Sequence, residues 1–187
     1  LLDFGFEGIE GGILLALKLF RATHDSSYFR FAVQLYTWTR NVLQAPSGLY
    51  YDNIQVATGR ISRAMYAYNT GTMLESAVMF YELTRQPGYL VEARREADTS
   101  AGYFCGGDHF RDGYWFTAVL VRAYQHLLEV DKDPKYLNAV RRCTDNALLH
   151  RKNDLGLMSA TVPVDLVNQA GMLEILARLA CLEEPAG

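Results

Sequence analysis

Two kinds of helical pattern alternate along this sequence, and their alternation restricts the fold more than any other feature. One kind is apolar on most sides, as expected of helices that neighbours cover all round. The other is amphipathic, with apolar residues at helical spacing and polar residues between them. The apolar kind occupies 13–20, 73–83, 115–128 and 166–182, and the amphipathic kind occupies 27–44, 89–104 and 136–149. The pattern predicts an all-α stack of helical hairpins, in which each inner helix is followed by an outer one.

The outer helices are expected to turn one face to water. In the second of them, Arg94, Arg95 and Glu96 are available for such a solvated face. The inner helices lack comparable charged runs, so we expect them to form the core.

The connections between these helices have two lengths. Each inner helix leads into a turn of a few polar residues, whereas each outer helix leads into a long connection. The long connections cover 45–68, 105–113 and 150–165. Because successive connections in a hairpin stack alternate between its two ends, all the long ones fall at the same end. Long loops held by a rigid scaffold carry function, so we expect the functional face there.

Composition and charge exclude several classes of function. The chain has 187 residues, is half apolar and carries a formal net charge of -3, which fits one soluble domain over 1–187 and gives no basic field for nucleic acid. No run approaches the roughly 20 apolar residues of a membrane span. Cys105, Cys143 and Cys181 are odd in number and widely spaced, so we interpret them as packing thiols. We expect a neutral ligand, no metal and no cofactor.

The first long connection mixes aromatic rings with hydrogen-bonding groups. Its candidate substrate-binding residues are Tyr51, Asp52, Tyr68 and Asn69. A pyranose offers an apolar C–H face that stacks on a ring, and a rim of hydroxyls that carboxylates and amides bind. These residue types together predict a sugar site. The structural alternatives are a packed tyrosine-rich loop, and an N-cap role for Asn69 before a helix over 71–84.

The second and third connections add further candidates. Arg111 and Asp112 stand at the mouth of an inner helix, although Asp112 is also a possible N-cap with which Arg111 would simply pair. His109 has no sequence partner for a nucleophilic triad, so we interpret it as a solvated loop histidine. Asp165 is expected to cap the last helix, and Gln169, one turn inside that helix, is a candidate to point into the same mouth.

Several motifs occur in an order that resembles a known family. They are Gly48-Leu49-Tyr50-Tyr51-Asp52-Asn53-Ile54, Tyr66-Ala67-Tyr68-Asn69-Thr70-Gly71, Leu83-Thr84-Arg85-Gln86-Pro87-Gly88-Tyr89-Leu90, Phe110-Arg111-Asp112-Gly113-Tyr114 and Asp165-Leu166-Val167-Asn168-Gln169-Ala170. This order resembles glycoside hydrolase family 76, the endo-α-1,6-mannanases and their relatives. The resemblance implies an (α/α)6 toroid with a sugar cleft at one end, an α-mannan polysaccharide or oligosaccharide as ligand, and an extracellular, periplasmic or cell-surface location.

The sequence departs from the family pattern at the catalytic acids. The family's chemistry resembles retaining hydrolysis, in which one carboxylate attacks the anomeric carbon and another serves as acid and base. The family's pair is an adjacent Asp-Asp in the first half of the toroid, and no Asp-Asp occurs in this sequence. Six or seven readable helices also leave no room for twelve. We therefore expect an incomplete domain, the C-terminal half of a toroid, which contributes the substrate-binding cleft and is inactive alone.

Two other functions stay open at this point. The chain could belong to a non-catalytic carbohydrate-binding or surface-assembly protein that keeps the cleft without the acids. The hairpin pattern alone fits other toroid sugar enzymes equally well, such as an unsaturated glucuronyl hydrolase or an N-acylglucosamine epimerase. For an acidic sugar, the available cations are Arg60, Arg63 and Arg111.

Overall fold

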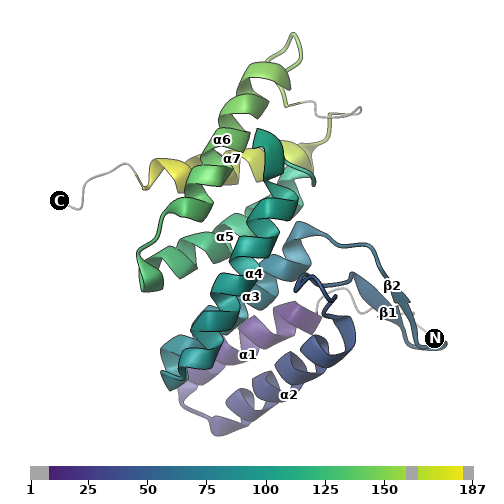
Figure 1. Cartoon of the computed structure of the whole chain (residues 1–187), viewed down its shortest axis with the longest axis vertical. Helices are drawn as coiled ribbons and strands as arrows, with labels where there is room; N and C mark the ends of the chain where they lie inside the picture. The colour runs from purple at the N-terminus through teal and green to yellow at the C-terminus, as the bar shows by residue number, and fades with distance from the viewer. Residues whose placement is uncertain (1–8, 159–163, 183–187) are drawn as a thin grey trace.

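The computed structural model describes residues 9–158 and 164–182, and seven α-helices and one short 3₁₀ helix (η1, Gly106–Asp108) run through them (Figure 1). The inner helices are α1 (Ile9–Thr23), α3 (Ala67–Thr84), α5 (Tyr114–Asp131) and α7 (Leu166–Ala180). The outer helices are α2 (Ser26–Leu43), α4 (Pro87–Phe104) and α6 (Lys135–His150). The all-α stack of hairpins expected from the sequence is confirmed.

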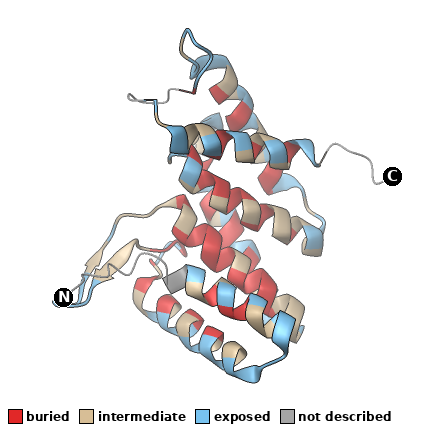
Figure 2. Ribbon diagram, turned by 180° about the vertical axis from the view of Figure 1, so that it is seen from behind, coloured by how far each residue is buried: buried red, intermediate tan, exposed pale blue. Residues whose placement is uncertain are grey.

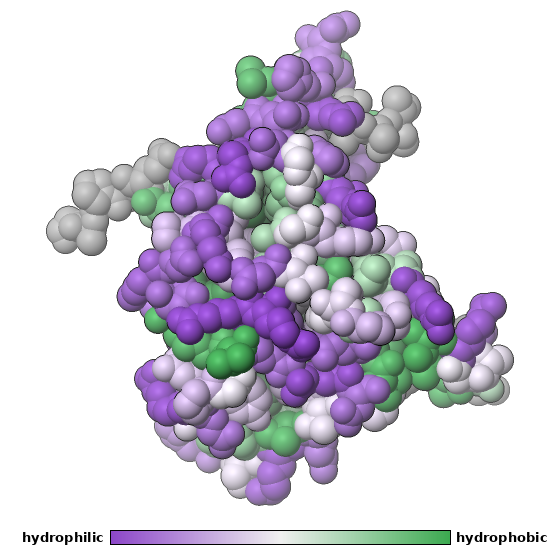
Figure 3. Space-filling view, viewed as in Figure 1, coloured by the Kyte–Doolittle hydropathy of each residue, from purple (hydrophilic) through white to green (hydrophobic). Residues whose placement is uncertain are grey.

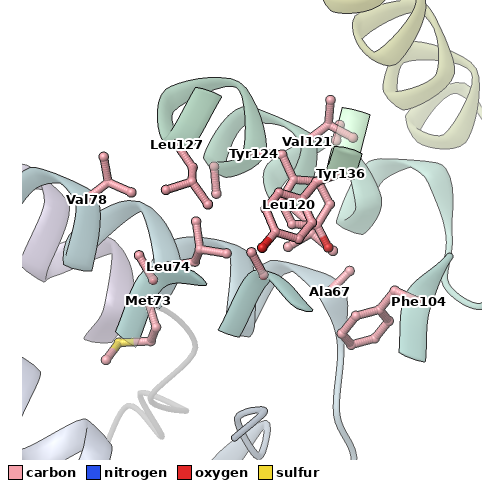
Figure 4. Close-up of a cluster of buried hydrophobic side chains, with 14 of the residues drawn as sticks. Ala67, Met73, Leu74, Val78, Phe104, Leu120, Val121, Tyr124, Leu127 and Tyr136 are labelled. Carbon is pink, nitrogen blue, oxygen red and sulfur yellow. The ribbon is translucent and has the colours of Figure 1, made fainter. Parts of the chain in front are cut away.

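The inner helices pack on one another in chain order, α1 on α3, α3 on α5 and α5 on α7. Figure 4 shows the resulting core, where Leu74 of α3 and Leu120 and Leu127 of α5 belong to one cluster of fully buried side chains. Each such leucine contributes about 1.5–3 kcal/mol when it leaves water. The core therefore lies between the inner helices, and it fixes their spacing.

Two glycines bring the beginnings of the inner helices close together. A Cβ atom at Gly71 of α3 would lie 2.7 Å from Leu120 Cα, and one at Gly171 of α7 would lie 2.6 Å from the carbonyl carbon of Tyr114. Both distances are shorter than any carbon contact, so only glycine fits there. The second turns of α3 and α7 consequently press directly on the α5 backbone.

The short turns reverse the chain sharply after each of the first three inner helices. His24, Arg85 and Lys132 adopt the left-handed conformation, with φ of 59°, 58° and 62°. This conformation breaks the helix and lets an antiparallel outer helix follow within a few residues. The long connections consequently lie at the opposite end of the stack.

A small sheet in the first long connection was not foreseen. Strands β1 (Asn53–Gln55) and β2 (Arg60–Ser62) pair antiparallel with Ile54 opposite Ile61, and the hairpin projects from the helical body (Figure 1). Three-residue strands are too short to produce a readable alternation. The hairpin is followed by the extended residues that lead into α3.

One expectation about the outer helices is wrong. Arg94 and Arg95 are exposed as expected, but Glu96 is fully buried. Its carboxyl group points toward the first long connection, where it accepts hydrogen bonds from Gln44 and Tyr50. The periodicity of the helix did not show this, because the partners are about fifty residues away.

The surface seen in Figure 3 is mostly hydrophilic, with separate hydrophobic areas, one of them beside the projecting hairpin. No helix in the described part of the chain is both long enough and apolar enough to cross a membrane.

Candidate functional site

The long connections meet at the N-terminal ends of α3, α5 and α7. Asp112 from the second connection reaches the first residue of α3, and a Cβ atom at Gly113 would lie 3.0 Å from Asn168 Oδ1 of α7. Helix N-terminal ends carry free N–H groups and a partial positive charge, which favour oxygen-rich ligands. This end of the stack is the candidate site.

The Asp52 carboxylate is held by side chains from α3 and from its own connection. Its Oδ1 atom accepts a hydrogen bond of 2.5 Å from Tyr68 Oη and a longer one of 3.5 Å from Asn69 Nδ2. Its Oδ2 atom accepts one of 2.6 Å from Asn53 Nδ2. Both carboxylate oxygens are thus oriented while the residue stays partly exposed. We call Asp52, Tyr68 and Asn69 the carboxylate clamp.

The other two candidates of the first connection are placed by the backbone. Asn69 lies inside α3, whose N-cap is Tyr66, so the N-cap alternative for Asn69 is wrong. Tyr51 is partly buried against the core, and its N–H donates to the Leu43 carbonyl over 2.9 Å. The structure therefore brings Asn69 to Asp52, and it anchors Tyr51 at the end of α2.

The Tyr68 ring of the clamp belongs to a cluster of three aromatic rings. Tyr66 and Tyr68 stack with centroids 6.0 Å apart and planes 10° apart, and Phe116 of α5 packs against them at 5.3 and 4.9 Å. All three are partly buried. A partly exposed ring next to a carboxylate is the combination that a sugar requires. Phe116 was missed because the sequence shows it only as one more apolar residue of an inner helix.

Asp112 caps a helix, although not the one expected. Its Oδ2 atom accepts a hydrogen bond of 2.8 Å from the N–H of Ala67, the first residue of α3, and its Oδ1 accepts one of 2.8 Å from Gly113 N–H. The N-cap of α5 is Gly113, without a side-chain cap. Burial raises the pKa of Asp112, and the two backbone hydrogen bonds oppose this rise. The expected N-cap role in its own helix is wrong, because the partner lies in a distant connection.

Arg111 does not pair with Asp112 in this structure. Its guanidinium lies over the Tyr103 ring, 4.1 Å from the centroid. The backbone N–H of Arg111 donates to the Phe104 carbonyl. Stacking through the face leaves the in-plane N–H groups of a guanidinium able to bind a ligand. His109 is exposed, as expected.

The third connection is held by Gln169 and Asp165. The Gln169 amide accepts from Met158 N–H at 2.9 Å and donates to the Met158 carbonyl at 2.6 Å. Asp165 caps α7 by accepting a hydrogen bond of 2.7 Å from Asn168 N–H, as expected. The amide group of Gln169 thus positions the connection.

A pocket of about 270 Å³ lies between the second connection, the end of α6 and the start of α7. This volume is close to the lower limit for ligand pockets, about 300 Å³. Its walls include Arg111, Asp112, Tyr114, Asn146, Arg151 and Asn168. Phe110 and Tyr114 meet edge to face in it, with centroids 5.9 Å apart. The pocket thus combines rings, amides and charged groups on the far side of Asp112.

Comparison with known families decides which proteins this chain resembles. The sequence profile of glycosyl hydrolase family 76 matches residues 11–114. The chain belongs to glycosyl hydrolase family 76. Curated protein sequences give no match.

Solved structures of family 76 enzymes share this fold, which is part of an α/α toroid. A family 76 glycoside hydrolase from a bovine Bacteroides thetaiotaomicron strain is 27% identical, with a TM-score of 0.81 over 94% of this chain and 43% of its own. The α-1,6-mannanase of Salegentibacter sp. HEL1_6 is 25% identical, with a TM-score of 0.79 over 91% of this chain and 57% of its own. The chain thus spans about half the length of these family 76 structures.

A further structure of the Salegentibacter enzyme shows what that protein binds. It is an inactive variant, with two consecutive aspartates replaced by asparagine, in complex with α-1,6-mannotriose, and it shares the 25% identity and the TM-score of 0.79.

The described residues of this family 76 chain show no group of three His, Cys, Asp or Glu side chains placed to hold a metal. Cys105 and Cys143 are buried, as packing thiols would be, and Cys143 Sγ lies 3.4 Å from the Cys105 carbonyl oxygen. Cys181 is exposed.

Proposed function

We propose that this chain supplies part of the substrate-binding cleft of a glycoside hydrolase that acts on α-1,6-linked mannan. The observation that carries the proposal is the carboxylate clamp of Asp52, Tyr68 and Asn69 beside a three-ring cluster, at one end of a family 76 fold. A mannose unit has a C–H face for a ring and hydroxyls for a carboxylate, and the clamp offers both partners.

The choice of α-1,6-mannan draws support from a related enzyme. The Salegentibacter α-1,6-mannanase covers 91% of this chain, and its inactive variant binds α-1,6-mannotriose. Arg111, Asp112 and Gln169 line or shape the same end of the stack as the clamp, so we propose that they belong to the same cleft as Tyr51 and the clamp. We further propose an extracellular, periplasmic or cell-surface location, where a polysaccharide is accessible.

We propose that the catalytic carboxylates lie outside this chain. Retaining hydrolysis requires two carboxyl groups about 5–5.5 Å apart, with the sugar between them. Asp112 uses both of its oxygens on backbone N–H groups, and Asp52 is held by three side chains. These two carboxylates therefore suit the roles of structural anchor and ligand-binding group.

The α7 helix supports the proposal that further helices of a toroid pack beside this chain, which we propose to be its C-terminal half. Its buried face, with Met172 and Ile175, packs on α5. The opposite face is exposed and apolar, with Leu166, Ala170, Leu173, Ala177 and Ala180 at helical spacing. Figure 2 shows these exposed turns on the helix that leads to the C-terminus. An inner helix that is apolar on both sides needs a neighbour on both sides, and we propose that the toroid's other helices cover this face.

A non-catalytic carbohydrate-binding protein is the alternative. The observation in its favour is that the clamp and the rings suit a sugar, while no Asp-Asp pair occurs in this sequence.

An assay of product release separates the two functions. The full-length protein, incubated with α-1,6-mannan, is expected to release oligosaccharides, and Tyr68→Phe is expected to lower the rate. Binding of the mannan without release would favour the alternative. Absence of both binding and release would refute the assignment of the cleft to mannan.

A further inference from the structure

A carboxyl group is buried between α2 and α4, away from the clamp. Glu96 of α4 is fully buried. Transfer of a charged carboxylate out of water costs several kcal/mol unless partners replace the water. A glutamate buried in the middle of an outer helix therefore needs protein partners in place of water.

The partners of Glu96 lie at the end of α2 and in the connection that builds the clamp. Tyr50 Oη donates a hydrogen bond of 2.8 Å to Glu96 Oε1. Gln44 Nε2 donates to the same oxygen at 3.2 Å and to Tyr50 Oη at 3.0 Å. Glu96 thus joins the end of α2, the first long connection and α4 at one point.

Tyr50 transmits this anchor to the clamp. Its side chain is fully buried, and its backbone N–H donates to Thr70 Oγ1 at 3.3 Å, next to Asn69. Asp52 follows two residues later, and its N–H donates to the Ala64 carbonyl at 2.9 Å. Two residues span at most about 7 Å. A displacement of Tyr50 therefore has little chain over which to relax before it reaches Asp52.

We infer that Glu96 is a positioning residue for the sugar cleft. By fixing the Tyr50 side chain, Glu96 holds Asp52 against Tyr68. The inference rests on the proposed function for its ligand, an α-1,6-linked mannoside. Glu96 acts through Tyr50, because its own side chain is fully buried.

The protonation state of Glu96 fits this role. Burial raises the pKa of Glu96 to about 8, although the Tyr50 hydrogen bond lowers it, so the group is mostly neutral at pH 7. Its Oε1 atom acts only as an acceptor toward Tyr50 and Gln44, and an amide oxygen can do the same. The titratable and charged groups around it are Tyr36, Arg40, Tyr50, Glu92 and Arg95.

Three variants of the full-length protein test the inference. Glu96→Gln keeps an acceptor, Glu96→Leu removes it, and Tyr50→Phe removes the donor by deleting one oxygen atom. Glu92→Leu is the matched control, since Glu92 lies one turn away on α4 and pairs with Arg40 at 2.7 Å. The readouts are amide hydrogen exchange of residues 49–53 and affinity for α-1,6-mannotriose.

For Glu96→Leu and Tyr50→Phe, we expect exchange in 49–53 to rise at least tenfold while α5–α7 stay unchanged. Mannotriose affinity should fall roughly tenfold, a loss of about 1.4 kcal/mol. Glu96→Gln should keep wild-type values in both readouts. Glu92→Leu should lower the unfolding temperature without changing either readout.

The inference is overturned if Tyr50→Phe leaves exchange in 49–53 unchanged, or if Glu92→Leu raises it equally. Because Tyr50→Phe is conservative, it keeps the test decisive even where Glu96→Leu does not fold. If the wild-type protein does not bind mannotriose, the proposed function fails. The exchange data still decide whether Glu96 positions the segment.

Discussion

The Asp112 carboxylate accepts a hydrogen bond of 2.8 Å from the backbone N–H of Ala67, 45 residues earlier in the chain. A side chain of the second long connection therefore caps α3, the helix that carries Tyr68 and Asn69. One carboxylate couples the pocket on one side of the site to the clamp on the other.

Asp112→Ala removes the partner of two backbone N–H groups at once. We expect the free energy of unfolding to fall by about 1–2 kcal/mol, as for the loss of a helix cap, and mannotriose affinity to fall with it. Asp165→Ala, which removes the local cap of α7, is the control and should lose similar stability without affecting the clamp. Urea titration measures the free energy of unfolding, and calorimetric titration measures the mannotriose affinity. Equal affinities in both variants would contradict the coupling.

The buried Glu96 carboxyl predicts a pH dependence with a definite sign. Its pKa is raised from the ordinary 4.5 to about 8 in the folded state, so the folded protein binds more protons than the unfolded chain between these values. Stability contributed by this group is therefore greatest below pH 4.5, and it is lost as pH rises toward 8. Each unit of the shift corresponds to about 1.4 kcal/mol.

Glu96→Gln should remove this dependence. As pH rises from 4.5 to 8.5, the wild type should lose a few kcal/mol of unfolding free energy that the variant does not lose. Urea titrations at the two pH values measure the difference. If the unfolding free energies of the variant and the wild type differ by the same amount at both pH values, Glu96 ionises normally.

Gly171 should tolerate no side chain. A Cβ atom there would lie 2.6 Å from the Tyr114 carbonyl carbon, so Gly171→Ala forces α7 away from α5 and should cost about 1–3 kcal/mol. Gly102→Ala on the exposed face of α4 meets nothing within 4 Å and should stabilise by up to about 1 kcal/mol. Thermal unfolding of both variants checks the prediction. Tolerance of alanine at Gly171 would mean that the helices do not approach this closely.

The exposed apolar face of α7 gives a test of the proposal that this chain is one half of a toroid. Leu173 of α7 is 67% exposed in this chain, and Leu149 of the outer helix α6 is 77% exposed. If the proposed other helices cover this face in the full-length protein, Leu173→Glu should destabilise it by more than about 2 kcal/mol. Leu149→Glu should stay within about 0.5 kcal/mol of wild type. Similar small effects at both positions would place the α7 face in water.

The sequence predicted those parts of the fold that depend on neighbours in the chain. The helices predicted to be apolar all round are the inner helices, and Asp165 caps α7 as predicted. Both predictions succeeded because helical periodicity and capping act within a few residues. It also grouped Asp52, Tyr68 and Asn69 as candidates, from the mixture of rings and hydrogen-bonding groups in the first long connection, and the structure brings their side chains into contact.

The rest depended on contacts that no local pattern reports. Asp112 was assigned to the wrong helix because its partner, Ala67, lies in another connection. Glu96 was assigned to a solvated face because Tyr50 and Gln44 approach α4 only in the folded state. The strands β1 and β2 were missed because three residues carry too little alternation.

Calorimetric titration of the full-length protein with α-1,6-mannotriose tests the central claim most directly. The wild-type protein should bind, and Tyr68→Phe should weaken binding about tenfold because it removes the 2.5 Å hydrogen bond to Asp52 while leaving the stacked rings in place. Tyr66→Phe, which keeps its ring in the same cluster, should bind as wild type. Equal affinity of the wild type and Tyr68→Phe, or no binding by a folded wild-type protein, would contradict the assignment of the sugar cleft.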